Sequence, residues 1–482
     1  MSNYKLVVGC VSLSLFLTSY IGNALTVAVP FFVEHYQTLP EYASFALAGY
    51  ATALACFLLP ASLLSKRFSN RSIFLLGHSL CAIITALIPL SPTLLILVLG
   101  RILQGAAASM CLATGMALIA NHVPTNKRYI AIGIAVCLTY AGVSSSLSFS
   151  GVIIDNYGYQ YMFYAASAAI ALLLTLAVRI PKDNQAFNFK DQSLPYGKLV
   201  LFVLSIGLCL LSLSALASFS YARYGLASGL ALLAVLVIYE YQNSKKDNYQ
   251  ELSTVIPVHF LVNNRRFTYC FLVSFAAYVS VMAEPVLLAL FSQYTLGISA
   301  TAAGFIIVVQ SITIAVVSYF TGRITKLLGD NATVTLGLII QTIALATFVV
   351  IDTNTTVLSL VLRQLAVGTG FALFSAPNTT LITLSVAPKD YALASSMQQL
   401  GRSLGQGTAY ALVTVTIAAL VSAAPGSIAY PEQFAKASVV ILAISAALGL
   451  LGIVLSALGY LESRKAENDS PLHENESSTL AA

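Results

Sequence analysis

Long apolar stretches separated by short polar connectors fill most of the chain. A helix needs about 20 residues, at about 1.5 Å rise per residue, to cross a bilayer core about 30 Å thick. Stretches of this order recur throughout the sequence. The pattern predicts fourteen transmembrane helices, at residues 6–29, 43–65, 72–90, 93–120, 129–153, 161–180, 198–218, 222–241, 267–291, 301–321, 333–351, 356–385, 391–422 and 434–459.

The polar connectors divide these helices into groups. We predict an N-terminal six-helix bundle over 1–180, a linker with two additional transmembrane helices over 181–254, and a C-terminal six-helix bundle over 255–462. Residues 463–482 are charged and lack apolar periodicity, so we expect a disordered cytoplasmic tail. Hydrophobic residues make up 58% of the 482 positions and charged residues 9%, whereas soluble domains carry about 25% charged residues. The predicted fold class is therefore an all-α integral membrane protein.

The basic residues indicate how the chain is oriented. The net charge is +6, and four basic pairs fall on one side if the helices alternate from an inside N-terminus: Lys66-Arg67, Lys127-Arg128, Lys245-Lys246 and Arg265-Arg266. Such an excess of Lys and Arg marks the cytoplasmic side of membrane proteins. We therefore expect a multi-pass protein of the bacterial inner membrane with both termini in the cytoplasm, and we attribute the net charge to topology rather than to a nucleic-acid partner.

The two groups of six helices resemble each other. Arg101 lies near the outer end of the fourth predicted helix and is followed by Gln104-Gly105, while Arg363-Gln364 lies at a similar depth in the twelfth, with glycines after it. A duplicated bundle with a site between its halves is a common architecture of secondary transporters. The repeat therefore predicts a transporter with a small-molecule cargo.

Four charged residues lie deep within the apolar stretches: Arg101, Glu284, Arg363 and Arg402. An ionised side chain at a helix centre costs about 2.5–3.5 kcal/mol on insertion scales, so such residues usually serve a function. Glu284 is the one acidic residue among them, and Pro285 follows it. We interpret Glu284 as the group that couples transport to protons. Two alternatives are an ion-pair partner for one of the arginines and an exposed position near the outer boundary.

Three roles remain open for Arg101 and Arg363: binding an anionic cargo, pairing with Glu284, or satisfying carbonyl groups at helix ends. Arg402 stands in a polar stretch whose glycines, Gly401 and Gly405, favour close helix packing. We therefore leave Arg402 out of the predicted site. The excess of deep cations favours an anionic or zwitterionic cargo.

Uncharged polar and aromatic residues of the apolar stretches supply further candidates for the cargo cavity. An alternative for each amide is a hydrogen bond to a neighbouring helix. No Cys-x-x-Cys motif or histidine spacing suggests a metal, and neither a cofactor nor clustered catalytic groups are expected. The predicted cavity residues are Asn23, Thr26, Gln104, Arg363, Gln293, Gln310 and Tyr278.

Several short strings, taken in order, resemble the major facilitator superfamily and in particular its 14-span drug:proton antiporter branch. The strings include Arg101-Ile102-Leu103-Gln104-Gly105, Val27–Pro30 and Gln399–Gly405. The resemblance implies export of small organic molecules by alternating access and a role for Arg101 in proton transfer. It also implies gating loops after the second and tenth helices, at Lys66, Arg67, Arg71, Arg323 and Lys326.

The chain departs from the family pattern at residues that concern gating and coupling. The acidic residue of the gating loop is replaced by Lys66 and, in the second half, by Lys326, and the second glycine of that loop is replaced by Ser69. Only Gly151 remains of the helix-five motif Gly-Pro-x-x-Gly-Gly, and Ile21 occupies the place of the helix-one aspartate. An alternative function is therefore an importer or facilitator of an organic anion without proton antiport. The sequence gives no indication for or against a periplasmic adaptor protein as a partner.

Overall fold

The computed structural model describes residues 3–124, 127–182, 195–243, 254–386, 391–423 and 427–468, and every long regular element in these ranges is a helix. The predicted basic pair Lys245-Lys246 and residues 469–482 of the predicted tail lie outside the described residues. The last helix continues to Asn468, past the boundary predicted at residue 462.

Each predicted span coincides with one long helix. The first six are α1 (Asn3–Asn23), α3 (Pro40–Phe68), α4 (Asn70–Leu87), α5 (Leu94–His122), α6 (Arg128–Tyr157) and α7 (Tyr159–Ala177). The two additional helices are α8 (Tyr196–Ala215) and α9 (Ala222–Asn243). The last six are α11 (Arg265–Tyr294), α12 (Ala300–Leu328), α13 (Asp330–Ala346), α14 (Val357–Leu384), α15 (Tyr391–Leu420) and α16 (Tyr430–Asn468).

The predicted all-α membrane fold is confirmed. Thirteen helices of the described residues are long and apolar enough to cross a membrane, and α6, with 30 residues, is the fourteenth long helix. Short helical pieces extend or connect them: η1 (Ala24–Val27), α2 (Val29–His35), η2 (Ile88–Leu90), α10 (Val258–Asn263) and η5 (Thr347–Val350).

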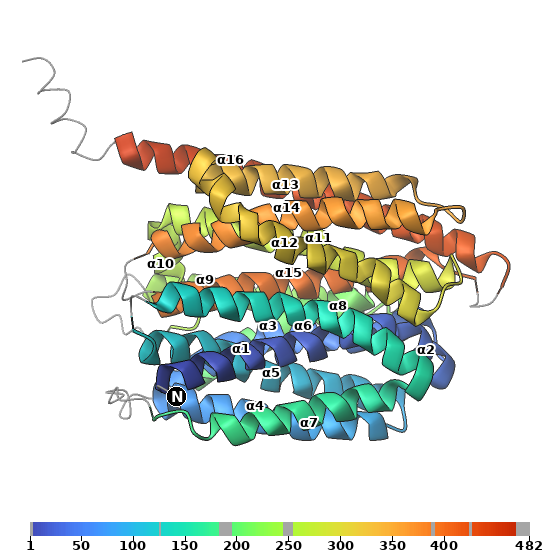
Figure 1. Ribbon diagram of the computed structural model, residues 1–482, viewed down its shortest axis with the longest axis horizontal. Helices are drawn as coiled ribbons and strands as arrows, with labels where there is room; N and C mark the ends of the chain where they lie inside the picture. Colours follow the sequence, from blue (N-terminus) through green and yellow to red (C-terminus); the bar gives the residue numbers. More distant parts are fainter. Residues whose placement is uncertain are drawn as a thin grey trace, which may run out of the picture.

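The helices form two bundles whose axes run nearly along the long axis of the molecule. Figure 1 shows α1 and α3–α7 in the lower part and α11–α16 in the upper part. The bundles pack against each other through α3 with α15 and through α6 with α12. Two pairs of helices therefore form the seam along which one bundle can move relative to the other.

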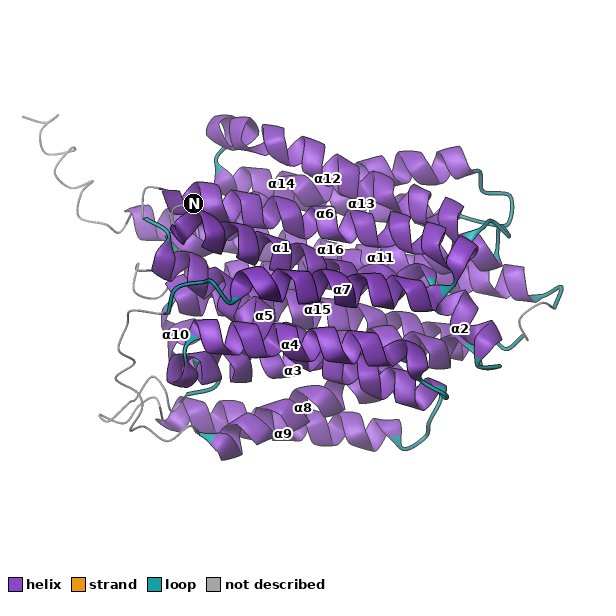
Figure 2. Cartoon of the chain, turned by 60° about the horizontal axis from the view of Figure 1, so that its bottom comes forward, coloured by secondary structure: helices purple, strands orange, loops and turns teal. Residues whose placement is uncertain are grey.

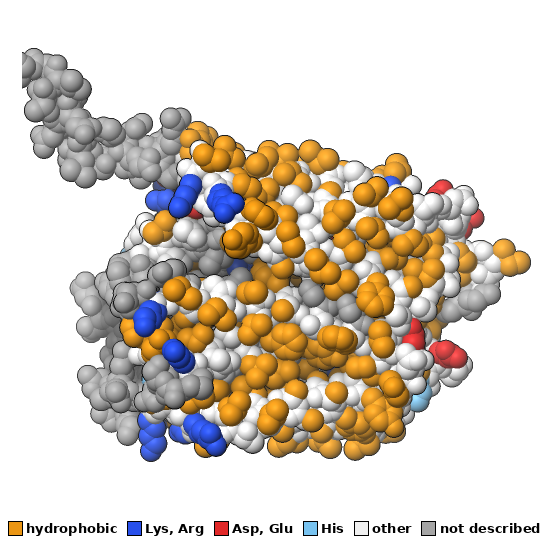
Figure 3. Space-filling view, viewed as in Figure 1, with side chains coloured by type: hydrophobic (Ala, Val, Ile, Leu, Met, Phe, Trp, Pro, Cys, Tyr) orange, Lys and Arg blue, Asp and Glu red, His pale blue; other side chains and the backbone are white. Residues whose placement is uncertain are grey.

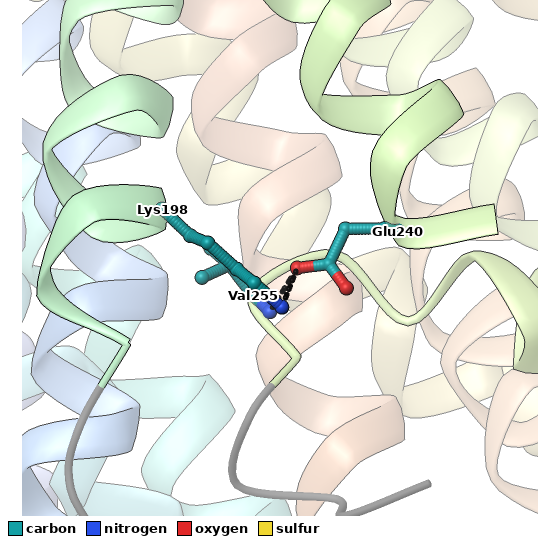
Figure 4. A network of polar contacts seen from close by, with 3 residues as sticks. All are labelled: Lys198, Glu240 and Val255. Atoms are coloured by element: carbon teal, nitrogen blue, oxygen red, sulfur yellow. Dashed lines mark hydrogen bonds and ion pairs between the residues drawn. The ribbon is translucent and has the colours of Figure 1, made fainter. Parts of the chain in front are cut away.

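The helices α8 and α9 lie side by side at one edge of the molecule (Figure 2). Helix α8 contacts α3 and α15, which belong to different bundles. Glu240 of α9 is 2% exposed, lies 3.5 Å from Lys198 Nζ of α8, and accepts a hydrogen bond from the backbone N–H of Val255 at 3.0 Å (Figure 4). One carboxylate thus joins the two added helices to the segment that begins the second bundle.

Charges separate to the two ends of the molecule, with an apolar surface between them (Figure 3). We call the end that carries Arg67, Lys127 and Arg265 the basic end, and the end that carries Glu34 and Asp155 the acidic end. The start of α1 and the end of α16 both lie at the basic end (Figure 1). The band of exposed apolar side chains between the two ends is the surface that lipid tails would cover.

Candidate functional site

Arg101 holds the end of α1. Its side chain is fully buried and donates hydrogen bonds to the carbonyls of Ile21 at 3.0 Å, Gly22 at 3.4 Å and Ala46 at 3.3 Å, and to the side-chain oxygen of Gln104. The last four carbonyls of a helix have no partner within it, and a cation is favourable at that end. Because α1 ends at Asn23, two of these bonds satisfy such carbonyls. Of the three roles left open for Arg101, the geometry matches the helix-end role.

The hydrogen bonds and the cation–π contact of Arg101 lie within the first bundle, and Tyr410 of α15 in the second bundle interacts with it electrostatically. The Arg101 guanidinium lies 4.3 Å from the centre of the Tyr50 ring, within the range of a cation–π contact. Gln104 is fully buried and donates to the hydroxyl of Thr85 at 2.6 Å. The side chain of Gln104, a predicted cavity residue, therefore bonds to α4 and to Arg101 of its own helix, both within the first bundle.

Close helix contacts show which residues of the two bundles correspond. A Cβ on Gly105 would lie 2.3 Å from the backbone oxygen of Tyr50, so α5 and α3 touch there. A Cβ on Gly368 would lie 2.6 Å from the backbone oxygen of Gln310 of α12. The predicted cavity residue Gln310 thus marks the same kind of contact in the second bundle.

Gln364, and not Arg363, occupies the place of Arg101 in the second bundle. Arg101 and Gln364 each stand one helical turn before the glycine of the close contact, and both are fully buried. Arg363 is half-buried, and its guanidinium lies 5.5 Å from the centre of the Phe348 ring. Since neighbouring helix positions point about 100° apart, the sequence comparison of Arg363 with Arg101 was one residue out of register.

Glu284 is buried inside the second bundle. Its side chain is 1% exposed, and neither carboxyl oxygen has a hydrogen-bond partner. The amide of Gln364 adjoins the carboxyl, but its atoms do not meet the geometry of a hydrogen bond. Among the described residues no cation pairs with Glu284. Two alternatives are therefore wrong: Glu284 is neither an arginine partner nor an exposed boundary residue.

The correspondence between bundles extends to Glu284. Arg101 contacts Ile21 of α1, and Gln364 adjoins Glu284 of α11. The first bundle therefore holds a buried cation beside an apolar residue, and the second holds a buried carboxyl beside an amide. The two charges therefore belong to opposite members of corresponding pairs in different bundles, and they do not neutralise each other.

The predicted polar residues at the end of α1 lie near the acidic end. Gln293 of α11 donates to the carbonyl of Val27 at 3.3 Å, and the Tyr410 hydroxyl of α15 lies 3.5 Å from the side-chain oxygen of Asn23. Thr26 is buried in η1. Asn23 and Gln293 thus contribute to contacts between the bundles rather than to one shared cluster with Arg101 or Glu284.

Asp155, which the sequence analysis missed, joins the bundles at the acidic end. Its carboxylate accepts hydrogen bonds from the backbone N–H of Thr301 at 2.9 Å and from the hydroxyl of the same residue at 2.5 Å. Thr301 lies in the first turn of α12, where free N–H groups favour an anion. A Cβ on Gly151 would lie 2.7 Å from the backbone oxygen of Ala300. The surviving helix-five glycine and the acid one turn after it were the available signal.

The predicted gating loops lie at the basic end. Arg67 donates to the Tyr196 hydroxyl of α8 at 3.1 Å, and Arg71 donates to the carbonyl of Val178 after α7 at 2.6 Å. Lys66 is half-buried. In the second half Arg323 lies 5.8 Å from the centre of the Phe320 ring, and Lys326 is exposed. The residues of the first loop therefore fasten α3 and α4 to neighbouring helices.

Tyr278, the last predicted cavity residue, lies at the seam between the bundles together with two residues that the prediction omitted. The guanidinium of Arg402 lies 5.5 Å from the centre of the Tyr278 ring. Tyr140 of α6 forms a hydrogen bond of 2.7 Å with Ser375 of α14. The sequence made Tyr140 one of several aromatic residues that could face a cargo, but a single aromatic residue in an apolar helix more often contacts lipid or the core, so Tyr140 was left out of the predicted cavity.

Two bundles of six membrane helices, one of which holds a buried carboxyl with no cation beside it, are typical of a membrane transporter. The chain belongs to the Major Facilitator Superfamily, whose sequence model matches residues 11–410 and 269–481. The chain is 22% identical over 403 residues to riboflavin transporter RibZ of Clostridioides difficile (strain 630), covering 83% of this chain and 86% of that protein.

A second relative covers nearly the whole chain. It is lincomycin resistance protein LmrB of Listeria monocytogenes, 22% identical over 465 residues, which are 94% of this chain and 96% of LmrB. The resemblance to the drug:proton antiporter branch is thereby confirmed. A solved D-xylose-proton symporter has the same fold, with a TM-score of 0.64 and 14% identity over 94% of this chain and 97% of the symporter.

Proposed function

We propose that this protein exports small organic molecules from the bacterial cytoplasm by alternating access, and that it exchanges them for protons through Glu284. The observation that carries the proposal is the carboxyl of Glu284, buried in a membrane helix without a hydrogen-bond partner or cation. The names of relatives such as lincomycin resistance protein LmrB support export of organic compounds.

The orientation follows from the charge at the two ends. Lys and Arg accumulate in cytoplasmic loops, so the basic end and both termini are proposed to face the cytoplasm. The contacts of Asp155 with Thr301 and of Gln293 with Val27 then close the periplasmic end in this conformation.

Glu284 suits the coupling role because its surroundings accept an uncharged carboxylic acid more readily than a carboxylate. A buried carboxylate requires donors or a cation, and the described structure supplies neither. Loss of the proton therefore requires a conformation in which water reaches α11. Pro285 lies within α11 and removes one backbone hydrogen bond there, which permits the helix to bend. Arg101, which links α5 to the end of α1, is proposed to transmit the movement within the first bundle.

A second function, import or facilitated diffusion of an organic anion, has one sequence feature in its favour. Only Gly151 remains of the glycines that antiporters of the family carry in helix five. In this alternative the same bundles move around the seam without a proton cycle.

The direction of transport separates the two functions. We suggest that bacterial cells producing the protein be loaded with riboflavin or lincomycin, compounds named for the relatives, and that their content be followed with and without a pH gradient. Export predicts faster depletion that stops when the gradient is collapsed. Accumulation that is indifferent to the gradient would support the importer instead.

A further inference from the structure

Two close helix contacts within the second bundle place Arg402 beside Tyr278. A Cβ on Gly405 would lie 2.7 Å from the Cβ of Tyr278, and a Cβ on Gly401 would lie 3.0 Å from the Phe271 ring. Helix α15 therefore lies directly against α11 over this stretch. The glycines account for the packing, and their effect is to place the Arg402 guanidinium beside the Tyr278 ring.

The hydrogen bonds of Arg402 leave most of its donors unused. One guanidinium nitrogen donates to the hydroxyl of Thr379 at 3.0 Å, and Nε has no partner. The same hydroxyl accepts from Gln398 at 2.8 Å and donates to the carbonyl of Ser375 at 2.9 Å, so it is fully used. No ion pair with Arg402 is present among the described residues. A guanidinium carries five N–H donors, so this cation retains capacity for an anion.

The Tyr278 ring beside this guanidinium belongs to a cluster of aromatic rings that come from both bundles. The Tyr278 and Phe371 rings meet edge to face at 5.5 Å, and the Tyr140 and Phe371 rings do so at 6.1 Å. Tyr140 belongs to α6 of the first bundle, whereas the other rings belong to α11 and α14 of the second. Tyr140, Tyr278 and Arg402 are half-buried, so part of each side chain remains accessible.

The other two deep arginines have different surroundings. The guanidinium of Arg101 is satisfied by three carbonyls and an amide inside the first bundle. Arg363 lies over Phe348 of η5, away from the first bundle. Arg402 differs from Arg101 because most of its donors are unused and it is half-buried, and the aromatic residues near it come from both bundles. The region between the bundles is where a cargo of an alternating-access transporter binds.

We propose that Arg402, Tyr278 and Tyr140 bind a planar aromatic anion, with the negative group on the Arg402 guanidinium and the ring system against the two tyrosine side chains, which the buried Phe371 ring supports. A guanidinium binds a carboxylate through two parallel hydrogen bonds, and aromatic rings pack edge to face or offset on one another. The proposal rests on the proposed transport function, since it names the class of cargo.

Equilibrium binding to the purified full-length protein in nanodiscs tests the site without requiring transport. The probes are 2-naphthoate, its uncharged analogue 2-naphthamide, and decahydro-2-naphthoate, which keeps the charge and loses the aromatic rings. Wild-type protein is expected to bind 2-naphthoate about tenfold or more tightly than either analogue by titration calorimetry. Equal affinity for 2-naphthoate and 2-naphthamide would overturn the proposal.

Variants of Arg402 and Tyr278 test which residue is responsible for the preference for charge and which for the preference for aromatic rings. Arg402→Gln is expected to abolish the preference for 2-naphthoate over 2-naphthamide, and Arg402→Lys, which keeps the cation, is expected to retain part of it. Tyr278→Leu should remove the preference for aromatic rings and keep that for charge. Arg223→Gln is the matched control, because Arg223 also lies over a tyrosine ring, 4.9 Å from that of Tyr224, on the exposed surface. An equal loss in the control would contradict the assignment.

The outcomes of binding and flux measurements distinguish failure of the binding site from failure of the proposed transport function. Arg402→Lys preserves size and charge, so it tests the site even where Arg402→Gln does not fold. Binding of 2-naphthoate with the expected preference, together with no flux of any compound in liposomes, would refute the transport proposal and leave the site. Transport of other cargo with no anion preference in binding would refute the site alone.

Discussion

At the scale of single residues, Ser69 has a backbone conformation that usually requires glycine. Its φ is 88° and its ψ is 144° at the turn between α3 and α4, and Gly329 has a φ of 82° at the corresponding turn between α12 and α13. Non-glycine residues in such regions carry about 1–3 kcal/mol of strain. The Ser69 hydroxyl offsets part of this cost, because it accepts a hydrogen bond from the backbone N–H of Ser72 at 3.2 Å.

Ser69→Gly is therefore expected to stabilise the protein by about 1 kcal/mol, since glycine relieves the strain and replacing a cap by glycine costs only a few tenths. The midpoint of thermal unfolding in detergent measures the effect. Gly329→Ser is the paired variant and is expected to destabilise, although a Cβ there meets no atom within 4 Å. A lower midpoint for Ser69→Gly would contradict the strain argument.

The residues of the candidate site differ in how visible they are in the sequence. Arg101 and Glu284 could be singled out because a charge within an apolar stretch is rare. Whether Arg101 and Glu284 form an ion pair could not be predicted, because that depends on contacts between helices that are distant in the chain. Gln364 was noticed only as the neighbour of Arg363, and Tyr140 only as one of several aromatic residues, because single amides and aromatic residues in membrane helices more often contact neighbouring helices or lipid. Arg402 was set aside because the glycines beside it explained the packing without it.

At the scale of helices, Asp155 is expected to hold the acidic end closed. Its two hydrogen bonds to Thr301 join α6 of one bundle to α12 of the other. Loss of a cap of this kind costs about 1 kcal/mol, so Asp155→Ala is expected to raise the population open at this end about fivefold. Distances between spin labels on the two bundles at the acidic end measure that population.

Thr301→Val is the graded comparison for this latch, because it removes the hydroxyl and keeps the backbone N–H. It should open the acidic end less than Asp155→Ala does. Identical distance distributions for wild type and Asp155→Ala would show that the close packing of Gly151 on Ala300 is sufficient for closure.

The ion pair of Lys198 and Glu240 is expected to fasten α8 to α9. Glu240 is buried, so its interaction with Lys198 is screened less than a surface pair. We expect Lys198→Met and Glu240→Gln to show a coupling energy of about 1–2 kcal/mol in a double-mutant cycle of unfolding free energies. Strictly additive effects would show that the bond from Val255 carries the whole contribution of Glu240.

The number of long helices and the approximate positions of their ends could be predicted from the sequence. Each is long enough and apolar enough to be recognised without any tertiary information, and the ends of most lie near the predicted ones. The short pieces at the acidic end, η1 and α2, were not predicted. Their residues continue the apolar stretch of α1, and the break after Asn23 depends on Arg101, which is distant in the chain.

At the scale of the whole molecule, the two bundles meet along α3 with α15 and α6 with α12, and are joined at the acidic end by Asp155 and Gln293. The sequence predicted two bundles because the second half repeats the first. It could not predict that Arg101 is matched in the second bundle by Gln364, or that Glu284 is matched in the first bundle by Ile21. This arrangement leaves Glu284 without a cation in the described conformation.

The central claim, that Glu284 couples cargo export to protons, is tested most directly by comparing two kinds of flux in the same proteoliposomes. Glu284→Gln is expected to keep cargo-for-cargo exchange, which needs no net proton movement, and to lose accumulation driven by an imposed pH gradient. Glu432→Gln, which changes an exposed carboxylate paired with Lys436, should behave as wild type. Gradient-driven accumulation by Glu284→Gln at the wild-type level would contradict the account.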